Sequence, residues 1–211
     1  MTEAIRASIE SADADALRSL VEADPRLADA DVAWGEGGKN VVPPLHFVCD
    51  AVFRGLADQE QALAMADVLL AAGVDPARAY AKSGDTFLIA AASLGAQSVG
   101  LRLVARGVDV GARGLFGATA LHWSAIMGLD RLAGALLAAG AELELLDEQY
   151  DCTPLQWALH GWSEGTNGDR DGIPRVARVL VGAGARVPAG AVDGLTGAAD
   201  AALRDALAGA P

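Results

Sequence analysis

Several residue types are scarce in this chain of 211 residues, and each scarcity excludes a class of protein. Lysine occurs only at Lys39 and Lys82, and the formal net charge is −12 at pH 7. An acidic chain lacks the basic face that nucleic acids and anionic membranes require. We therefore expect no nucleic acid and no membrane as partner, whereas a neutral or basic partner fits the charge.

Cysteine is equally scarce, since the chain contains only Cys49 and Cys152. Two isolated cysteines do not make a disulfide framework, so we interpret both as reduced packing residues. Residues 1–6 do not resemble a signal peptide. Uncharged runs such as residues 86–101 contain Ser, Gly and Gln and fall short of the about 20 apolar residues that cross a membrane. These observations predict a cytoplasmic protein.

Aromatic residues make up only 5% of the chain, although apolar residues make up 52%. The apolar residues are mostly Ala, Leu and Val, which is the composition of helices packed closely through small side chains. The length suffices for one domain with a core of its own. The composition therefore predicts an all-α fold, and the excess of Arg over Lys suggests a bacterial genome of high GC content.

A unit of about 33 residues recurs along the chain, and its clearest copy begins Thr-Ala-Leu-His at residue 119. Leucines at 45, 88, 121 and 155 are 43, 33 and 34 residues apart, and glycines at 73, 107, 140 and 184 are 34, 33 and 44 apart. Each unit predicts two helices: Thr or Pro suits the start of the first, and Gly in a left-handed conformation suits the end of the second. The two longer copies carry insertions between their two helices.

The recurring unit resembles the ankyrin repeat, whose pattern runs T-P-L-H-x-A-A-x-x-G-H-x-x-V-V-x-x-L-L-x-x-G-A-D. The resemblance implies one domain over residues 1–211, an ankyrin-repeat solenoid of stacked helix–turn–helix units with finger loops. In the N-terminal cap we expect a helix over residues 2–10, then Asp13 as the N-cap of a second helix, and a polar outer face. The predicted segments are an N-terminal capping repeat at 1–34, repeats at 43–75, 86–109, 119–142 and 153–186, and a C-terminal cap at 195–211.

The resemblance also implies which side chains face the concave groove of the solenoid. At these positions the chain carries Trp, Phe, Ile and Met, so the expected groove is unusually apolar, and Trp is a favoured anchor at interfaces. The alternative is that the insertions fold back and bury these rings as additional core. A binding groove and buried rings are compatible if an insertion forms a lid over the groove. The candidate binding residues are Phe47, Asp50, Leu94, Phe116, Trp123, Ile126, Met127, Tyr150, Trp157, His160 and Trp162.

Our first hypothesis is a protein-binding module without enzymatic activity. Its apolar groove takes a segment of an unidentified protein, and the acidic finger loop over residues 144–151 selects a segment with basic residues. The plainer interpretation of that loop, Asp147 included, is a solvated connection. Under this hypothesis the substitutions Trp123→Ala and Trp157→Ala weaken binding and leave the fold intact.

The second hypothesis is a Trp-lined pocket for a hydrophobic small molecule, with proton-transfer or cyclisation chemistry. His160 titrates near neutrality and is the candidate acid–base group, with Asp151 or Asp50 as the carboxylate. The family contains few enzymes, so we expect no catalytic residue and no cofactor unless this hypothesis holds. A third interpretation is a repeat domain whose surface is incidental. His46 and His122 occupy the His position of the repeat, where the resemblance implies bonds to neighbouring backbone.

Two stretches imitate ligand-binding motifs and depart from them. Residues 35–40 are Gly-rich and contain Lys39, but Ala33 stands where a phosphate-binding loop needs its first glycine. We predict a loose loop over residues 31–42. Residues 167–172 imitate the first half of a calcium loop, but Arg178 stands where the bidentate Glu belongs. We therefore expect no metal site.

Overall fold

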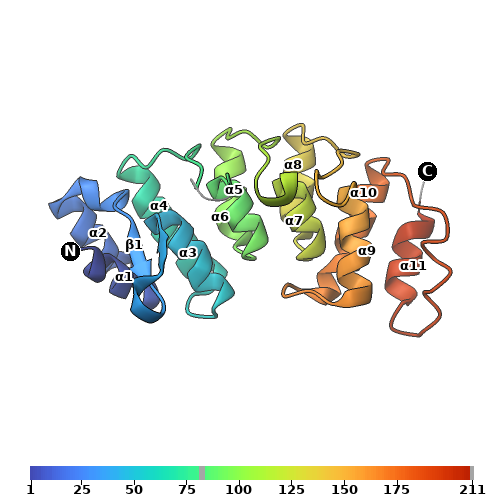
Figure 1. Ribbon diagram of the computed structural model, residues 1–211, viewed down its shortest axis with the longest axis horizontal. Coiled ribbons are helices and arrows are strands. Elements are labelled where there is room, and N and C mark those ends of the chain that lie inside the picture. Colours follow the sequence, from blue (N-terminus) through green and yellow to red (C-terminus); the bar gives the residue numbers. More distant parts are fainter. Residues whose placement is uncertain (81–83, 210–211) are drawn as a thin grey trace. The chain divides into compact units, whose positions relative to one another are not determined.

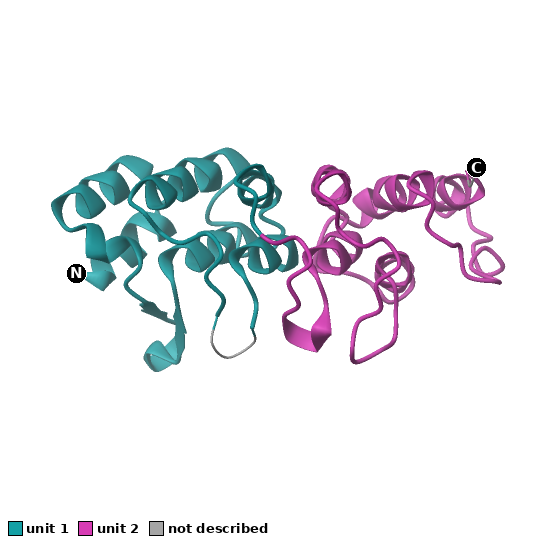
Figure 2. Cartoon of the chain, turned by 90° about the horizontal axis from the view of Figure 1, so that it is seen from above, with its two compact units in different colours: residues 1–108 teal, residues 109–211 magenta. Residues whose placement is uncertain are grey.

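The chain is almost entirely helical in the computed structural model, which describes residues 1–80 and 84–209. Eleven α-helices and a two-stranded sheet occupy that part of the chain (Figure 1). The chain divides into two compact units, residues 1–108 and residues 109–211 (Figure 2). The predicted all-α class is confirmed, whereas the single domain and the solenoid stay predictions.

Unit 1 consists of three helix pairs that follow one another along the chain. The members of each pair pack together, α1 with α2, α3 with α4, and α5 with α6. The first helices also contact one another in the order α1, α3, α5, and the second helices in the order α2, α4, α6. The bounds are α1 Thr2–Glu10, α2 Ala14–Ala23, α3 Pro44–Phe53, α4 Gln59–Ala71, α5 Phe87–Ser93 and α6 Gln97–Ala105, with the short 3-10 helices η1 Pro25–Ala28 and η2 Glu36–Gly38.

The connection between α2 and α3 is a β-hairpin, so the prediction of a loose loop here is wrong. β1 (Val32–Trp34) pairs antiparallel with β2 (Asn40–Val42), with Val32 opposite Val42. The glycines between the strands have positive φ, which a tight turn requires. The hairpin lays Trp34 against Phe47 of α3, with ring centroids 5.7 Å apart. Two short apolar runs, Val32–Trp34 and Val41–Val42, on either side of a Gly-rich turn were the signal for it.

Unit 2 repeats the paired arrangement. α7 packs on α8 and α9 on α10, while α7 also contacts α9 and α8 contacts α10. The terminal helix α11 packs on α10 and begins at Ala201, later than the cap predicted from residue 195, whose last two residues lie outside the described part. The bounds are η3 Leu115–Gly117, α7 Ala120–Ile126, α8 Asp130–Ala138, α9 Pro154–Glu164, η4 Arg170–Gly172, α10 Ile173–Gly182 and α11 Ala201–Ala208.

The helices begin and end at the residues that local chemistry favours. The carboxylate of Asp13 accepts a hydrogen bond from the N–H of Ala16 at 2.9 Å, as predicted. Thr153 caps α9 in the same way, with its hydroxyl 3.3 Å from the N–H of Gln156. The second helix of each repeat ends at a left-handed glycine, also as predicted, with φ of 95°, 73°, 93° and 99° at Gly73, Gly107, Gly140 and Gly184.

Both insertions lie between the two helices of their repeat, as the spacing predicted. The first is partly absorbed by longer helices, since α3 and α4 have 10 and 13 residues against 7 and 9 in α5 and α6. The second, residues 165–172, folds back onto the end of α7, where the N–H of Asp169 donates to the carbonyl of Met127 at 3.0 Å. Arg175 of α10 fastens it, with its guanidinium 2.8 Å from the Asp169 carboxylate.

The fold-back depends on glycines that touch backbone. A Cβ at Gly168 would lie 2.4 Å from the carbonyl oxygen of Met127, whereas a Cβ at Gly182 meets nothing within 4 Å. We expect Gly168→Ala to lower the free energy of unfolding by about 1 to 3 kcal/mol. Gly182→Ala, at the end of α10, is the control and should raise it by up to about 1 kcal/mol. Urea denaturation followed by circular dichroism measures both, and equal effects would contradict this close packing.

Candidate functional site

Four aromatic rings of unit 2 form a closed circuit of contacts, which we call the aromatic cluster: Phe116, Trp123, Trp157 and Tyr150. In that order the ring centroids are 6.2, 5.0 and 6.4 Å apart, and the circuit closes from Tyr150 to Phe116 at 5.7 Å. The two indoles meet edge to face at 79°, a favourable aromatic geometry. Tyr150 is 55% exposed, while Phe116 and Trp123 are half-buried, so the cluster reaches the surface.

Two helices and the loops before them bring these rings together. Trp123 and Trp157 each stand four residues after the threonine that precedes α7 or α9, and these two helices pack on each other. The repeat register therefore accounts for the adjacent indoles. Phe116 lies in η3, before α7, and Tyr150 lies in the loop before α9. Phe116 has φ of +65°, which costs a residue other than glycine about 1 to 2 kcal/mol and must be held by its surroundings.

The two loops are bonded to each other. The N–H of Glu148 donates to the carbonyl of Phe116 at 2.9 Å. The guanidinium of Arg113 donates to the carbonyls of Gly117 at 3.0 Å and Leu146 at 3.1 Å, and lies 3.6 Å from the Glu148 carboxylate. These contacts hold the loop of Phe116 and the loop of Tyr150 in one arrangement.

His122 is buried beneath the loops and bonds on both sides of its ring. Nδ1 accepts from the N–H of Thr119 at 3.2 Å, so the proton sits on Nε2, which donates to the carbonyls of Leu145 at 3.1 Å and Cys152 at 3.2 Å. Burial lowers the pKa of His122, although the carbonyls and the charge of Asp147 act against it. The neutral ring thus bonds neighbouring backbone, as predicted for this position.

Asp147, predicted in a solvated acidic loop, is only 1% exposed and holds that loop from within. Its Oδ1 accepts from the N–H groups of Gln149 at 2.9 Å and Tyr150 at 2.7 Å. Its Oδ2 accepts from the N–H of Cys152 at 3.1 Å and the indole N–H of Trp157 at 3.0 Å. Burial acts to raise the pKa of this carboxyl, but the bonds from Trp157 and the backbone prevail and hold it below its usual range. The solvated interpretation is wrong for this residue.

The surroundings of the aromatic cluster are strongly acidic. Residues 109–118 and 141–152, which carry two of its rings, contain six carboxylates and the single guanidinium of Arg113. Such an imbalance gives the surface a negative potential that attracts cations and repels anions. We call the aromatic cluster together with these two loops the aromatic–acidic surface.

The open apolar groove predicted from the repeat positions is largely closed in unit 2. Met127 and Trp157 are 5% and 7% exposed, and Ile126 is half-buried. The folded-back residues 165–172 bond the carbonyl of Met127. The alternative that the insertion buries these side chains therefore describes them better. Trp157→Ala no longer separates binding from folding, because Trp157 also bonds a buried carboxylate.

Trp162, predicted as a binding residue, belongs instead to the packing of the C-terminal helix. It is 6% exposed, and its indole N–H donates to the carboxylate of Asp200, just before α11, at 3.0 Å. The guanidinium of Arg170 lies 4.0 Å from the ring centroid and donates to the Trp162 carbonyl at 3.1 Å. Both polar contacts lie within unit 2 and fasten its end.

Three further predicted binding residues lie in unit 1. Phe47 is fully buried, because Trp34 of the hairpin covers it and the Arg54 guanidinium lies 5.9 Å from its ring centroid. Its predicted exposure in a groove is therefore wrong. Asp50 is 8% exposed on α3, and Leu94 is half-buried at the end of α5. Sequence reasoning missed Trp34, whose position depends on the hairpin.

The predicted acid–base pair does not form. His160 is exposed near the end of α9, whereas Asp151 precedes the start of that helix. The part of α9 between them rises about 10 Å, which is too far for proton transfer. Asp50, the other candidate carboxylate, lies in unit 1.

The other chemistry-bearing residues are placed as packing residues. Cys49 and Cys152 are free thiols, and burial raises the pKa of both. The ring of His46 packs against that of Tyr80, with centroids 5.8 Å apart. Within residues 1–80 and 84–209, no three His, Cys, Asp or Glu side chains are placed to hold a metal ion. No helix in the same residues has the length and apolar character to cross a membrane.

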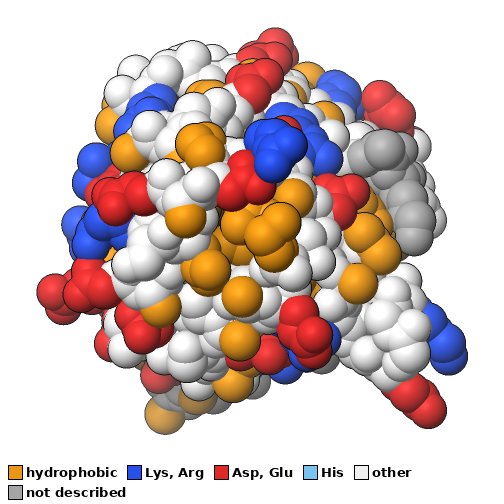
Figure 3. Space-filling model, turned by 90° about the vertical axis from the view of Figure 1, so that its left-hand side faces the viewer, with side chains coloured by type: hydrophobic (Ala, Val, Ile, Leu, Met, Phe, Trp, Pro, Cys, Tyr) orange, Lys and Arg blue, Asp and Glu red, His pale blue; other side chains and the backbone are white. Residues whose placement is uncertain are grey.

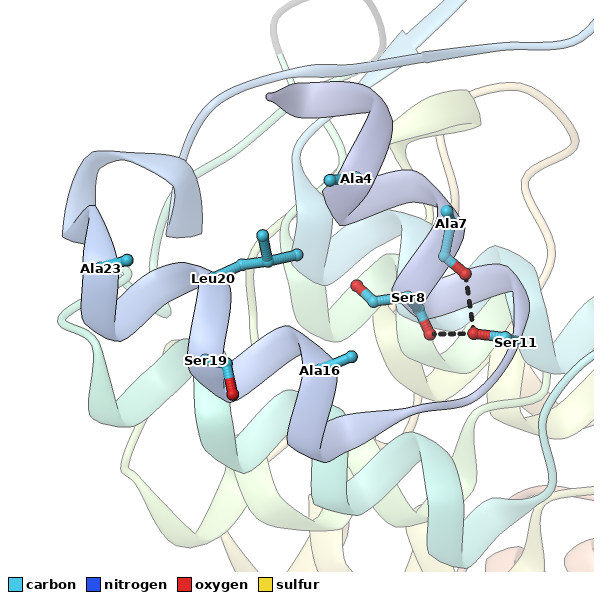
Figure 4. Close-up of a pocket in the computed structure, with 8 residues that line it drawn as sticks. All are labelled: Ala4, Ala7, Ser8, Ser11, Ala16, Ser19, Leu20 and Ala23. Carbon is cyan, nitrogen blue, oxygen red and sulfur yellow. Dashed lines mark hydrogen bonds between the residues drawn. The ribbon is translucent and has the colours of Figure 1, made fainter.

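A second surface lies at the outer face of α1 and α2 in unit 1, where the cap was predicted to be polar. Apolar side chains gather there inside a charged rim (Figure 3) and line a hollow of about 530 Å³ (Figure 4). The polar outer face predicted for the cap is therefore wrong at this hollow. Ser11 in its wall already donates to the carbonyl of Ala7 at 2.8 Å. The lining residues are Ala4, Ala7, Ser8, Ser11, Ala16, Ser19, Leu20 and Ala23.

Comparisons with known proteins add no relative to this description. No family model matches the chain, and no curated protein matches it.

The two indole N–H groups of the cluster differ in a way that stability measurements detect. The N–H of Trp157 bonds Asp147, whereas that of Trp123 is enclosed without a partner among the described residues. We expect Trp157→Phe to lower the free energy of unfolding by about 1.5 to 3 kcal/mol, because a charged acceptor loses its donor. Trp123→Phe should change it by less than about 1 kcal/mol. Equal losses in urea denaturation would contradict the role of the Trp157–Asp147 bond.

We predict that Asp50 lowers the free energy of unfolding as the pH rises, whereas a carboxylate bonded in the folded protein raises it. Burial raises the pKa of Asp50 from 3.8 to about 6, despite the opposing charge of Arg54. Between pH 3.8 and about pH 6, Asp50 is therefore protonated in the folded protein and ionised in the unfolded chain. The free energy of unfolding falls across this range and stays lower above pH 6, where the buried carboxyl is ionised. We expect Asp50→Asn to raise the free energy of unfolding by about 1 to 3 kcal/mol at pH 8 and hardly at pH 4. A gain that is the same at both pH values would refute this account.

Proposed function

We propose that this protein is a binding module of ankyrin-type repeats that takes a segment of another protein on the aromatic–acidic surface of unit 2. Several features support the ankyrin type: paired helices that begin after threonine, left-handed glycines at the ends of second helices, and His122 bonded to the backbone of the following loop. Such repeats serve as rigid scaffolds for interaction surfaces. The free thiols support a reducing, cytoplasmic location.

The observation that carries the proposal is an exposed aromatic ring on a loop that is fixed from below. Tyr150 is 55% exposed, yet its backbone N–H is bonded to the buried carboxylate of Asp147 at 2.7 Å. Phe116 beside it has a strained backbone that its bond from Glu148 holds. A pre-organised aromatic surface loses little entropy on binding, and aromatic residues dominate the energetics of interfaces.

The surface differs from the groove that the repeat positions predicted, and the difference favours a partner with basic residues. Trp157 and Met127 are buried, so the exposed rings are those of the loops and of Trp123. The two loops that carry Phe116 and Tyr150 also carry six carboxylates, together with the exposed side chains of Leu115 and Leu146. Charge complementarity of this kind selects partners and speeds their association. Catalysis has less support, because His160 is exposed and Asp151, its candidate carboxylate in unit 2, precedes the start of α9.

The test is affinity capture from the cells that produce the protein, with the full chain immobilised and captured proteins quantified by mass spectrometry. We expect Tyr150→Ser to reduce the recovery of the partner at least about tenfold, as loss of a hot-spot ring does. Phe53→Ser is the matched control, because Phe53 is an aromatic residue of unit 1 with a similar exposure, 47%. Its capture profile should equal that of the unaltered chain.

Two outcomes would refute the proposal. The first is capture of the same proteins in the same amounts by the Tyr150→Ser variant. The second is a captured set that does not exceed that of the bare support. Circular dichroism of each variant ensures that a lost partner is not the result of a lost fold.

A further inference from the structure

We propose that the aromatic cluster binds the guanidinium of an arginine side chain from the partner polypeptide. The inference rests on the proposed function and specifies its chemistry. It is drawn from three observations in unit 2: the angles between the rings, the carboxylate bonded to one of the indoles, and the excess of negative charge around them.

The ring geometry has the dimensions of a cation site. A cation about 4 to 5 Å in front of two ring faces at right angles leaves their centroids about 6 to 7 Å apart. Phe116 and Tyr150, the rings of the two loops, come close to this, at 5.7 Å and 56°. Trp157 packs against Tyr150 at 6.4 Å and 65°, and at 7% exposure it supports the pair from within. Trp123 meets Trp157 edge to face at 5.0 Å and supports that ring from the side.

A buried negative charge lies in the loop that carries Tyr150. The Asp147 carboxylate accepts the indole N–H of Trp157 at 3.0 Å and the backbone N–H of Tyr150 at 2.7 Å, and is only 1% exposed. This charge adds to the attraction of the exposed Tyr150 ring for a cation. The partners of this carboxylate are N–H groups rather than a cationic side chain, so its charge is solvated but not neutralised.

The carboxylates around the cluster are not neutralised by basic side chains of the same loops. Arg113 is the only basic residue of the two loops, and its guanidinium is already engaged by Glu148 and by the carbonyls of Gly117 and Leu146. Asp147 and Asp151 remain as negative charges next to the rings in the sequence. A partner cation therefore meets a surface with net negative charge.

Two contacts elsewhere in the chain indicate why the cation is a guanidinium. Arg170 lies 4.0 Å from the centroid of Trp162 and donates to a carbonyl at 3.1 Å. Arg54 lies 5.0 Å from the centroid of Trp34 and bonds Glu10 at 3.4 Å. In both, the guanidinium lies over an indole while its N–H groups bond an oxygen, and its planar array of five donors suits this double contact better than a compact ammonium does. The aromatic–acidic surface supplies both elements, rings and carboxylates.

The experiment uses the full chain labelled with ¹⁵N and three peptides, acetyl-Gly-Leu-X-Leu-Gly-amide, with X as arginine, lysine or trimethyllysine. The four indole N–H signals report the site of binding. We expect the arginine peptide to bind about tenfold more tightly than the lysine peptide. The signals of Trp123 and Trp157 should shift, and those of Trp34 and Trp162 should not.

Variants of Tyr150 test the ring itself. Tyr150→Ser should lower the affinity for the arginine peptide about tenfold and Tyr150→Phe less than about twofold. Phe53→Ser should leave this affinity unchanged. Equal affinity for the arginine and lysine peptides, tightest binding of the trimethyllysine peptide, or shifts confined to Trp34 and Trp162 would overturn the inference. If capture of a protein depends on Tyr150 while the peptides bind alike, the binding function stands and the guanidinium anchor is wrong. If the arginine peptide binds as expected and no protein is captured, the proposed function fails instead.

Discussion

The arrangement of the candidate surface depends on one buried carboxylate. Asp147 accepts hydrogen bonds from three backbone N–H groups and from the indole of Trp157. Burying an unpaired charge costs several kcal/mol, so a carboxylate at 1% exposure persists only because each of its oxygens is bonded. The same four bonds fix the course of the loop and the plane of one indole. Loop and helix α9 are therefore constrained by a single group, and neither can move without leaving a buried charge exposed or unpaired.

His122 complements Asp147, because it satisfies carbonyl groups where the carboxylate satisfies N–H groups. Its Nε2 bonds the carbonyls of Leu145 and Cys152, which lie on either side of Asp147 in the sequence. Two side chains thus provide the hydrogen bonds that a loop without regular structure cannot provide for itself. The pKa of His122 is lowered mainly by burial, so the ring stays in the neutral form that can both accept and donate. This polar framework is why Tyr150 can be exposed and still have a defined position.

The sequence predicted the parts of this structure that depend on local chemistry and on the repeat. Helix starts at Asp13 and Thr153 and left-handed glycines such as Gly140 follow from capping and steric rules, which need no knowledge of distant residues. The burial of Asp147 and Trp157 could not be predicted in this way, since it depends on a bond between a loop and a helix that no periodicity encodes. The hairpin that buries Phe47 had a local signal, the two short apolar runs that flank its Gly-rich turn.

The repeats themselves indicate that one ring of the aromatic cluster, Trp123, exceeds what folding requires. Trp123 and Trp157 follow their capping threonines by four residues, and Ala90 holds the same position after Thr86 in α5. Ala90 is 1% exposed, so that repeat packs its first helix with a methyl group where unit 2 carries indoles. Stability explains Trp157, which bonds Asp147, and the buried Phe47 of α3, but not the half-buried Trp123, whose N–H has no partner among the described residues. The placement of Trp123 near an exposed tyrosine and an excess of carboxylates fits the proposed binding of a cationic, partly apolar segment.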